Sequence, residues 1–391
     1  MTWIDDITLD ELEADPYPIW ARLRREAPVA YVPAVGGWFV TRRDDVLATR
    51  RMRQIGVATA LPRMERTLGM PNVLMVDGPA HTDLRAAIDP LLLPKAVPAY
   101  AEDLIRPIAA SAVGALPDSG EVELMETFEL VSCLAVARLV GLDVDGPTLR
   151  RWFQSLAGGI ANVAMLPGPF GESDRAIQEM RAAVDPLLDR LEHEPDDGML
   201  AHMLYAGRPP GDPRPRAHIH SSILVVIAGG AQEPGHLAGT TVHGLLGRPE
   251  QMRRVLADPG LIPRAMDEAL RWEAMLPIVD RQATADLVLG GREIAEGDLI
   301  EVCVGSANRD EAHVEHPDVF DLDRDAPAHV SFGIGAHVCA GRNFGREVAR
   351  ITLDELTARY AGLDPVEHKP VRVRGFTMRA PKELYVSVTA R

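Results

Sequence analysis

The sequence predicts a mainly α-helical fold with a minor β component, an α+β class. Between residues 80 and 205, most of the chain carries apolar residues at helical spacing, with proline and glycine at the boundaries. Short apolar runs near Gly36, near Gly290 and in LIEVCVG predict strands, and the alternating tail VRVRGFTMRAPKELYVSVTAR predicts a hairpin that turns near Pro381. No repeat and no flexible linker is evident, so residues 1–391 are expected to form one domain.

The predicted elements follow in a simple order. The first helix, PYPIWARLRREA, precedes the strands VAYVP and GWFVT. A series of helices comes next: AHTDLRAAIDPLLL, AEDLIRPIAASAVGAL, ETFELVSCLAVARLVGL and SDRAIQEMRAAVDPLLDRLEHE. Further helices are PEQMRRVLADP, LIPRAMDEALRWEAM and GRNFGREVARITLDELTARY, with short strands between the last two.

One predicted helix contains residues that weaken it. The run SSILVV leads into IAGGAQEPGH (residues 227–236), and LAGTTVHGLL then resumes an apolar pattern. Paired glycines, a proline and two polar residues in a buried helix lower its stability. We therefore expect these residues to serve a function.

Composition excludes several classes of protein. The formal charge of −16 argues against nucleic acid or an anionic membrane as the main partner. No stretch approaches ~20 uninterrupted apolar residues, and the N-terminus is acidic rather than signal-like. The three cysteines, Cys133, Cys303 and Cys339, form neither a disulfide framework nor a CxxC zinc motif. We expect a protein of the cytoplasm, where thiols stay reduced.

The stretch SFGIGAHVCAGR (residues 331–342) surrounds Cys339 with Gly333, Gly335 and Gly341, which allow the backbone to approach another group closely. A helix follows at once, and its N-terminal N–H groups favour a thiolate. Such a thiolate suits an axial ligand to haem iron. The alternative is a buried cysteine that fills a tight turn. Cys133, in the middle of a predicted helix, and Cys303, in the middle of a predicted strand, are most simply core residues. The spacing F-G-x-G-x-H-x-C-x-G favours the haem ligand.

This loop resembles the haem-binding loop of the cytochrome P450 family, and the resemblance runs along the whole chain, from DPYPIW through ANRD and HPDVFD to the final hairpin. It implies the cytochrome P450 fold and one haem b, with Cys339 as the metal ligand and Phe332 and Gly333 in the cofactor-binding loop. It also implies a monooxygenase that inserts oxygen into its substrate, by hydroxylation or O-dealkylation.

Glu268 and Arg271 match the family's E-x-x-R motif. Residues three apart share one face of a helix and can pair. The resemblance implies that Arg324, in FDLDR, joins this pair and that the three brace the cysteine loop. The alternative is an exposed helical ion pair, and the position of the motif before the cysteine loop favours the family role.

Four cationic or cationisable residues match the family's contacts to the haem propionates. His81 and Arg85 lie one turn apart in DGPAHTDLR, so both can reach one anionic group. Arg281 and His337 match the other two contacts. Each alone would be an ordinary surface cation, but together they indicate an anion site.

The stretch IAGGAQEPGH takes the place of the family's A-G-x-[DE]-T, whose acid and alcohol relay protons during dioxygen cleavage. Counting back from Pro249 aligns Gly230 with the glycine, Gln232 with the acid and Glu233 with the alcohol. Glutamine cannot ionise and can only hold a water, whereas a buried glutamate should have a raised pKa and can move protons. Pro234 cannot bond to the Gly230 carbonyl, so the helix should bend open. The alternative is a plain kink with both polar side chains turned to solvent.

Three function classes remain open. The first is a monooxygenase that uses dioxygen and electrons from a separate ferredoxin and reductase. The second is a peroxygenase driven by hydrogen peroxide, with Glu233 as acid and base. The third is a thiolate-haem sensor. A faint resemblance of Gln-Glu to aryl methyl-ether demethylases indicates a substrate of that kind. We expect a monomer without a fused reductase.

The fold that the resemblance implies also gives expected pocket positions, and their apolar character indicates a small hydrophobic substrate. They are Val226, Gly229, Gly230, Ile278, Val279, Phe376 and Thr377, with Ile55, Val57, Leu61 and Met64 in a capping segment and Asn162 and Phe170 in the roof. On the helix after Cys339, on the side of the haem that the cysteine occupies, an arginine stripe should steer an acidic ferredoxin, unless it is only a solvated helix face. It comprises Arg342, Arg346 and Arg350.

Overall fold

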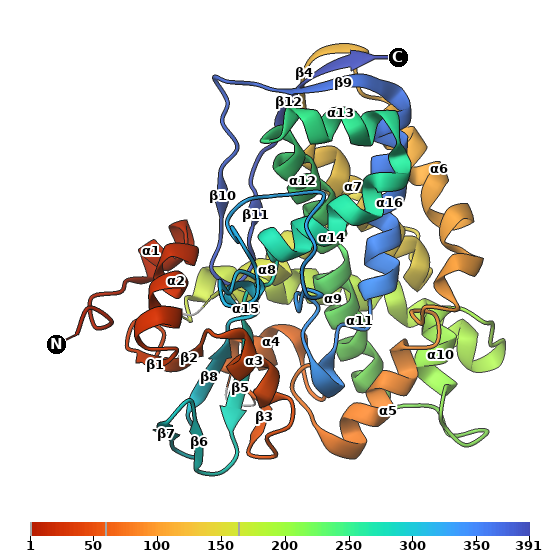
Figure 1. Ribbon diagram of the computed structural model, residues 1–391. Helices are drawn as coiled ribbons and strands as arrows, with labels where there is room; N and C mark the ends of the chain where they lie inside the picture. Colours follow the sequence, from red (N-terminus) through yellow and green to blue (C-terminus); the bar gives the residue numbers. More distant parts are fainter. Residues whose placement is uncertain (1, 59–60, 163–164) are drawn as a thin grey trace.

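The computed structural model describes residues 2–58, 61–162 and 165–391. Helices make up most of it, with one sheet beside the N-terminal helices and another at the opposite end, beside the C-terminus (Figure 1). The helices of the first half are α1 (Leu9–Ala14), α2 (Tyr17–Glu26), α3 (Arg43–Thr49), α4 (Pro62–Leu68), α5 (Gly78–Ile88), α6 (Ala101–Gly114), α7 (Met125–Val140), α8 (Gly146–Ile160) and α9 (Pro167–His193). Those of the second half are α10 (Met199–Tyr205), α11 (Arg216–Gly230), α12 (Glu233–Leu246), α13 (Pro249–Ala257), α14 (Ile262–Trp272), α15 (Val304–Asn308) and α16 (Arg342–Arg359).

A five-stranded sheet joins the N-terminal region to residues 279–302. Its order is β1-β2-β8-β5-β3, and its strands are β1 (Val29–Val32), β2 (Gly37–Val40), β3 (Ile55–Val57), β5 (Val279–Ala283) and β8 (Leu299–Val302). The β1–β2 hairpin pairs with β8 in parallel, whereas β5 pairs with β3 and β8 antiparallel. This register places Arg281 opposite Val57 and Ile300, inside the sheet.

The second large sheet has the order β4-β12-β9, with strands β4 (Ser119–Glu123), β9 (Tyr360–Pro365) and β12 (Tyr385–Ala390). A hairpin joins β6 (Leu287–Leu289) to β7 (Arg292–Ile294), and another joins β10 (Val373–Arg374) to β11 (Ala380–Pro381). The expected turn near Pro381 is therefore wrong, because Pro381 lies within β11 opposite Val373. The end of the tail instead pairs with β4 and β9.

The predicted central helix is two helices. α11 ends at Gly230 and α12 begins at Glu233, and Pro234 lies in the first turn of α12, where its missing N–H costs little. Proline cannot donate to the carbonyl of Gly230, so the regular ladder stops there. The prediction of a bent helix was right in position, but the interruption is a break rather than a bend.

Glycines bring this broken helix close to α7. A Cβ on Gly230 would meet Val136 at 2.7 Å, one on Gly235 would meet the carbonyl oxygen of Phe128 at 2.7 Å, and one on Gly239 would meet Met125 at 2.2 Å. These spacings leave no room for a larger side chain. Because α7 lies directly behind the break, its side chains can reach the backbone and the polar residues there.

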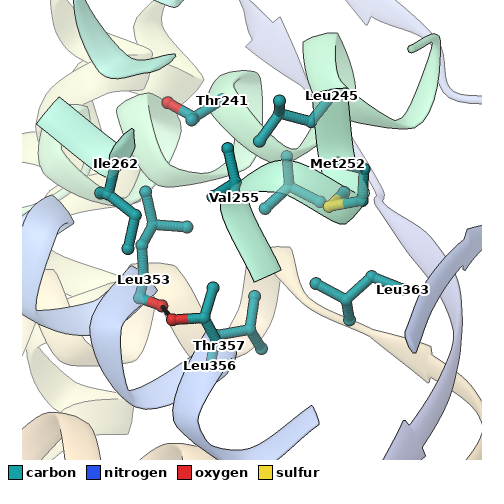
Figure 2. A pocket seen from close by; sticks show the side chains of 10 residues that line it. Thr241, Leu245, Met252, Val255, Ile262, Leu353, Leu356, Thr357 and Leu363 are labelled. Atoms are coloured by element: carbon teal, nitrogen blue, oxygen red, sulfur yellow. Dashed lines mark hydrogen bonds between the residues drawn. The ribbon is translucent and has the colours of Figure 1, made fainter. Parts of the chain in front are cut away.

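A small hollow in the second half of the chain is a packing void rather than a site. Figure 2 shows it between α12, α13, α14, α16 and β9. Its walls are almost entirely apolar, and the hydroxyls of Thr241 and Thr357 donate to carbonyls within their own helices, those of Leu237 and Leu353. It offers a ligand no free polar group. Among the described residues, no helix combines the length and the apolar character needed to cross a membrane.

Candidate active site

The cysteine loop is held open by its glycines. Gly333 and Gly335 have φ values of 73° and 79°, in the left-handed region that favours glycine, and the backbone N–H of Cys339 donates to the carbonyl of Phe332 at 2.9 Å. Burial raises the pKa of the Cys339 thiol, and the N–H of Gly341 partly offsets the rise. Yet Cys339 is exposed. Cys339 is therefore accessible although protein surrounds much of its thiol.

Arg85 fastens this loop to α5. Its Nη1 donates to the carbonyl of Val338 at 2.8 Å, and its Nε donates to Asp89 at 2.7 Å. The guanidinium therefore holds the backbone one residue before the cysteine. It can still reach an anion beside the loop, but its observed partners are in the protein.

A buried triad lies behind the loop. Arg271 donates to both carboxylate oxygens of Glu268 at 2.7 and 2.8 Å, and the Nε of Arg324 donates to the same carboxylate at 3.0 Å. Both arginines also donate to the carbonyl of Val319, and Arg271 donates to that of Pro317. The structure thus brings together the three residues named from the sequence. They clamp the segment that leads to the cysteine loop, and they are not exposed to solvent.

Residues of the predicted anion site lie close together, and their role there stays a prediction. The rings of His81 and His337 lie 4.0 Å apart, and the Nε2 of His337 lies 2.6 Å from the Oδ1 of Asp77. The Nε2 of His81 is buried without a hydrogen-bond partner among the described residues. Burial lowers the pKa of Arg281, and within the described ranges no ion pair joins it to an acid. A buried guanidinium and an unpartnered imidazole nitrogen suit a ligand that carries carboxylates.

The break between α11 and α12 is fixed by two contacts from α7. The Nε2 of Gln232 donates to the Oε1 of Glu129 at 2.8 Å, and the Sγ of Cys133 donates to the carbonyl of Ala231 at 3.3 Å. Gln232 therefore points towards α7 and not towards solvent. The backbone carbonyl that the break exposes at Ala231 also has its partner on α7.

Glu233 carries a further unsatisfied atom, at the break. Its Oε2 is buried and has no hydrogen-bond partner among the described residues. Burial raises the pKa of Glu233 to about 7, opposed by the backbone N–H groups of Glu233 and Gln232. Its charge also contributes to the raised pKa of Cys339, so the two groups lie within electrostatic range of each other. The alternative in which this side chain faces solvent is wrong.

The expected pocket residues have unequal access to open space. Gly229 is exposed, and a Cβ placed there would meet no atom within 4 Å. Val226, one turn earlier, and Val279 are half-buried, whereas Ile278 and Phe376 are each 7% exposed, and Phe376 stacks on Phe39. The open face is therefore on α11. The role of all five as substrate contacts stays a prediction.

The expected roof and cap residues are mostly engaged in packing. Phe170 is buried beneath the guanidinium of Arg66, and the amide of Asn162 exchanges two hydrogen bonds with the backbone of Leu166. Val57 is buried in β3, while the other three cap residues are half-buried. The part of the cap at residues 59–60 lies outside the described residues.

The comparisons with known proteins agree with this geometry. The sequence model described as Cytochrome P450 matches residues 256–385. Cytochrome P450 107B1 of Saccharopolyspora erythraea is 30% identical over 378 residues, which cover 90% of this chain and 90% of that protein. The chain belongs to the cytochrome P450 family.

Other similar proteins carry names that indicate different activities and ligands. Pulcherriminic acid synthase of Bacillus subtilis is 26% identical over 367 residues, covering 89% of each chain. The crystal structure of P450BioI with an acyl carrier protein that bears hexadec-9Z-enoic acid has a TM-score of 0.86 and 25% identity, covering 97% of this chain and 100% of that one. This P450 is accordingly an oxidoreductase and a monooxygenase by family, and its cofactor is haem b with the thiolate of Cys339 as axial ligand.

The proximal arginine stripe of this P450 is largely neutralised. Arg346 pairs with Asp267, and Arg350 pairs with Glu102, Glu347 and Asp354. Only the third member, Arg342, forms no ion pair in the described part of the chain. The three arginines share a helix face as expected, but they do not present three free charges.

Sequence reasoning missed Glu129 and assigned Cys133 only to packing. The available signal was a glutamate inside the otherwise apolar run ETFELVSCLAVA, since a buried carboxylate needs a partner. Cys303 is buried as expected, but it lies between β8 and α15, as the N-cap of α15, and not within a strand.

Proposed function

We propose that this P450 inserts an oxygen atom into a small hydrophobic substrate, by hydroxylation or by O-dealkylation of an aromatic methyl ether, and that Glu233 handles the protons. The observation that carries the proposal is the Oε2 of Glu233, at the break between α11 and α12, which is buried and has no partner in the described part of the chain. A carboxyl whose pKa lies near 7 can release and regain a proton at neutral pH.

The residues present fit a haem. Cys339 would hold the iron, Phe332 and Gly333 would shape the loop around the sulfur, and the carboxylates of the porphyrin would lie against a set of cationic side chains: His81, Arg85, Arg281 and His337. When bound, the haem supplies the activation of oxygen. The protein's own part is to orient the sulfur, neutralise the propionates and control protons on the other side.

In this proposal Glu233 holds a proton at Oε2 and releases it to the oxidant, while Gln232 cannot take part because an amide does not ionise. The amide of Gln232 can instead orient a water molecule. The carbonyl of Gly230, which Pro234 cannot reach with a hydrogen bond, is a further acceptor at the break. This combination supports a distal site in which one acid replaces the usual acid–alcohol pair.

Replacement of Glu233 tests this role. With ferredoxin, reductase and NADPH, Glu233→Gln and Glu233→Ala should convert less of the consumed NADPH into product, by about tenfold or more. Glu233→Asp, which keeps the acid, should retain more of the coupling. Unchanged coupling in Glu233→Gln would remove Glu233 from the mechanism.

The same acid favours hydrogen peroxide as a second oxidant. Glu233 would accept a proton from one peroxide oxygen and return it to the other, as general base and then general acid. Wild-type protein should then oxidise substrate with peroxide alone, and Glu233→Gln should lose this activity. Equal peroxide-driven turnover in both proteins would contradict the peroxygenase proposal.

The substrate class rests on the open apolar face near Val226 and Gly229. A screen of small aromatics and terpenoids for a low- to high-spin shift would name the compound. We also propose that a separate ferredoxin delivers electrons and that the protein acts in the cytoplasm, as a monomer of one domain. The three free cysteines support this location.

A further inference from the structure

A second acid, Glu129, lies behind the break in the distal helix and has no part in the roles proposed above. It projects from α7 and is 9% exposed. Its Oε1 accepts the hydrogen bond from Gln232 and lies 3.6 Å from the Nε2 of His236. An ionised carboxylate can only accept hydrogen bonds, so this contact directs the Nε2 of Gln232 towards α7. The amide oxygen of Gln232, its Oε1, can then accept from another donor.

Glu129 is connected to the surface through charged groups. Its Oε2 lies 3.3 Å from Nη2 of Arg150, and Nη1 of Arg150 donates to Glu126, whose side chain is 70% exposed. Burial favours the neutral form of Glu129, but hydrogen bonds from His236 and Gln232 and the charges of His236 and Arg150 outweigh it and lower its pKa. Glu129 is therefore a carboxylate that can accept a proton from solvent.

The two acids of this region lie close to the same turn. Burial raises the pKa of Cys133 to about 12, and the charges of Glu129 and Glu233 both add to the rise. Cys133 itself donates to the carbonyl of Ala231, within the break. Glu129 and Glu233 thus approach the break from α7 and from α12.

We propose that Glu129 supplies protons to Glu233, taking them from solvent beside its ion pair with Arg150 and passing them across the break by way of water held at the amide of Gln232. The inference rests on the proposed role of Glu233. It gives this P450, on α7, the acid that its distal helix lacks at Gln232.

The proton balance separates this role from that of Glu233. With dioxygen, the substrate, O2, two electrons and two protons give the oxygenated product and water, so solvent must provide both protons. Hydrogen peroxide brings both protons with it, and its reaction with substrate gives product and water with no net uptake. Only the first reaction needs a route from solvent.

The test compares Glu129→Gln with Glu129→Asp, using anisole as probe substrate. Glu129→Gln should lower turnover with ferredoxin, reductase and NADPH by about tenfold, and should leave peroxide-driven turnover within about twofold of wild type. Glu129→Asp keeps the charge and should retain most of both activities. Glu192→Gln serves as control because it removes a Glu–Arg pair, with Arg216, that is remote from the break.

A spectroscopic readout is independent of turnover. The infrared C–O stretch of the reduced carbon monoxide complex should broaden or split in Glu129→Gln, because an amide at residue 129 can donate or accept and no longer fixes Gln232. Glu129→Asp should keep a single band. An unchanged band together with unchanged dioxygen-driven turnover would overturn the inference, as would an equal loss with both oxidants, which marks a structural role. Unchanged turnover of Glu233→Gln would instead overturn the proposed function.

Discussion

The guanidinium of Arg85 donates a hydrogen bond to the carbonyl oxygen of Val338, 2.8 Å away and one residue before Cys339. Asp89 accepts from the same side chain and fixes its direction. A residue that the sequence placed beside the haem propionates therefore also holds the backbone of the cysteine loop. Cofactor binding and loop geometry depend here on one side chain.

Arg85→Ala should loosen the cysteine loop, because a hydrogen bond to a charged donor contributes about 1.5–3 kcal/mol. We expect a lower haem content and a smaller long-wavelength Soret band of the thiolate form in the reduced carbon monoxide spectrum. Arg85→Lys keeps the charge but not the forked geometry of the guanidinium, so its haem content should lie between those of wild type and Arg85→Ala. A spectrum of Arg85→Ala equal to that of wild type would contradict this role.

Glu233→Gln should change how stability depends on pH. In the folded protein the pKa of Glu233 is about 7, above its ordinary value of 4.5. Near pH 8 the folded state must hold a buried carboxylate, at a cost of about 3 kcal/mol, whereas below pH 4.5 the acid is neutral in both states and the cost vanishes. This contribution to stability therefore rises as pH falls from about 8 to 5.

Urea denaturation at several pH values measures this effect. The gain in unfolding free energy of Glu233→Gln over wild type should be largest near pH 8 and small near pH 5. Glu126→Gln, at an exposed site on α7, should follow the wild-type curve. If the plots of unfolding free energy against pH were parallel for wild type and Glu233→Gln, the pKa of Glu233 would not be raised in the folded protein.

Two glycines of the broken helix should respond oppositely to alanine. Gly235→Ala would place a Cβ 2.7 Å from the carbonyl oxygen of Phe128, and backbone cannot yield cheaply, so we expect a loss of about 1–3 kcal/mol in unfolding free energy. Gly229→Ala meets no atom within 4 Å and should gain up to ~1 kcal/mol from helix propensity. Urea denaturation compares them. Equal effects would show that α7 does not pack as closely as described.

Glu268→Gln should be strongly destabilising, by about 3–5 kcal/mol, because it leaves two buried arginines without their carboxylate. Glu250→Gln is the matched control. It removes a Glu–Arg pair with the same three-residue spacing, to Arg253, but on the surface, where such pairs contribute little. Similar unfolding midpoints for the two variants would contradict a bracing role for the triad.

The sequence led to those parts of the site in which residues lie near one another along the chain. The glycine and cysteine spacing predicted the loop, and the three-residue spacing of Glu268 and Arg271 predicted their pairing on one helix face. Pro234 predicted where the central helix is interrupted. Each of these rests on local geometry, which a single sequence contains.

The contacts between distant helices could not be predicted in this way. Gln232 and Glu129 are 103 residues apart, and nothing in one sequence says that α7 lies behind the break. The neutralisation of the arginine stripe could not be predicted for the same reason, because Arg350 pairs with Glu102, which lies 248 residues away in the sequence. Burial of Glu233 followed from the resemblance, but its lack of a partner among the described residues depends on how distant helices pack.

The interruption at Pro234 is fixed by covalent structure, so it exists before substrate or oxidant arrives. A helix that had to unwind on binding would divert part of the substrate's binding energy into that change and would link affinity to distal geometry. In this chain the break is already present, so substrate binding need not supply that change. Substitutions on the open face of α11 can therefore retune which molecules bind without altering the arrangement of the acid that serves them.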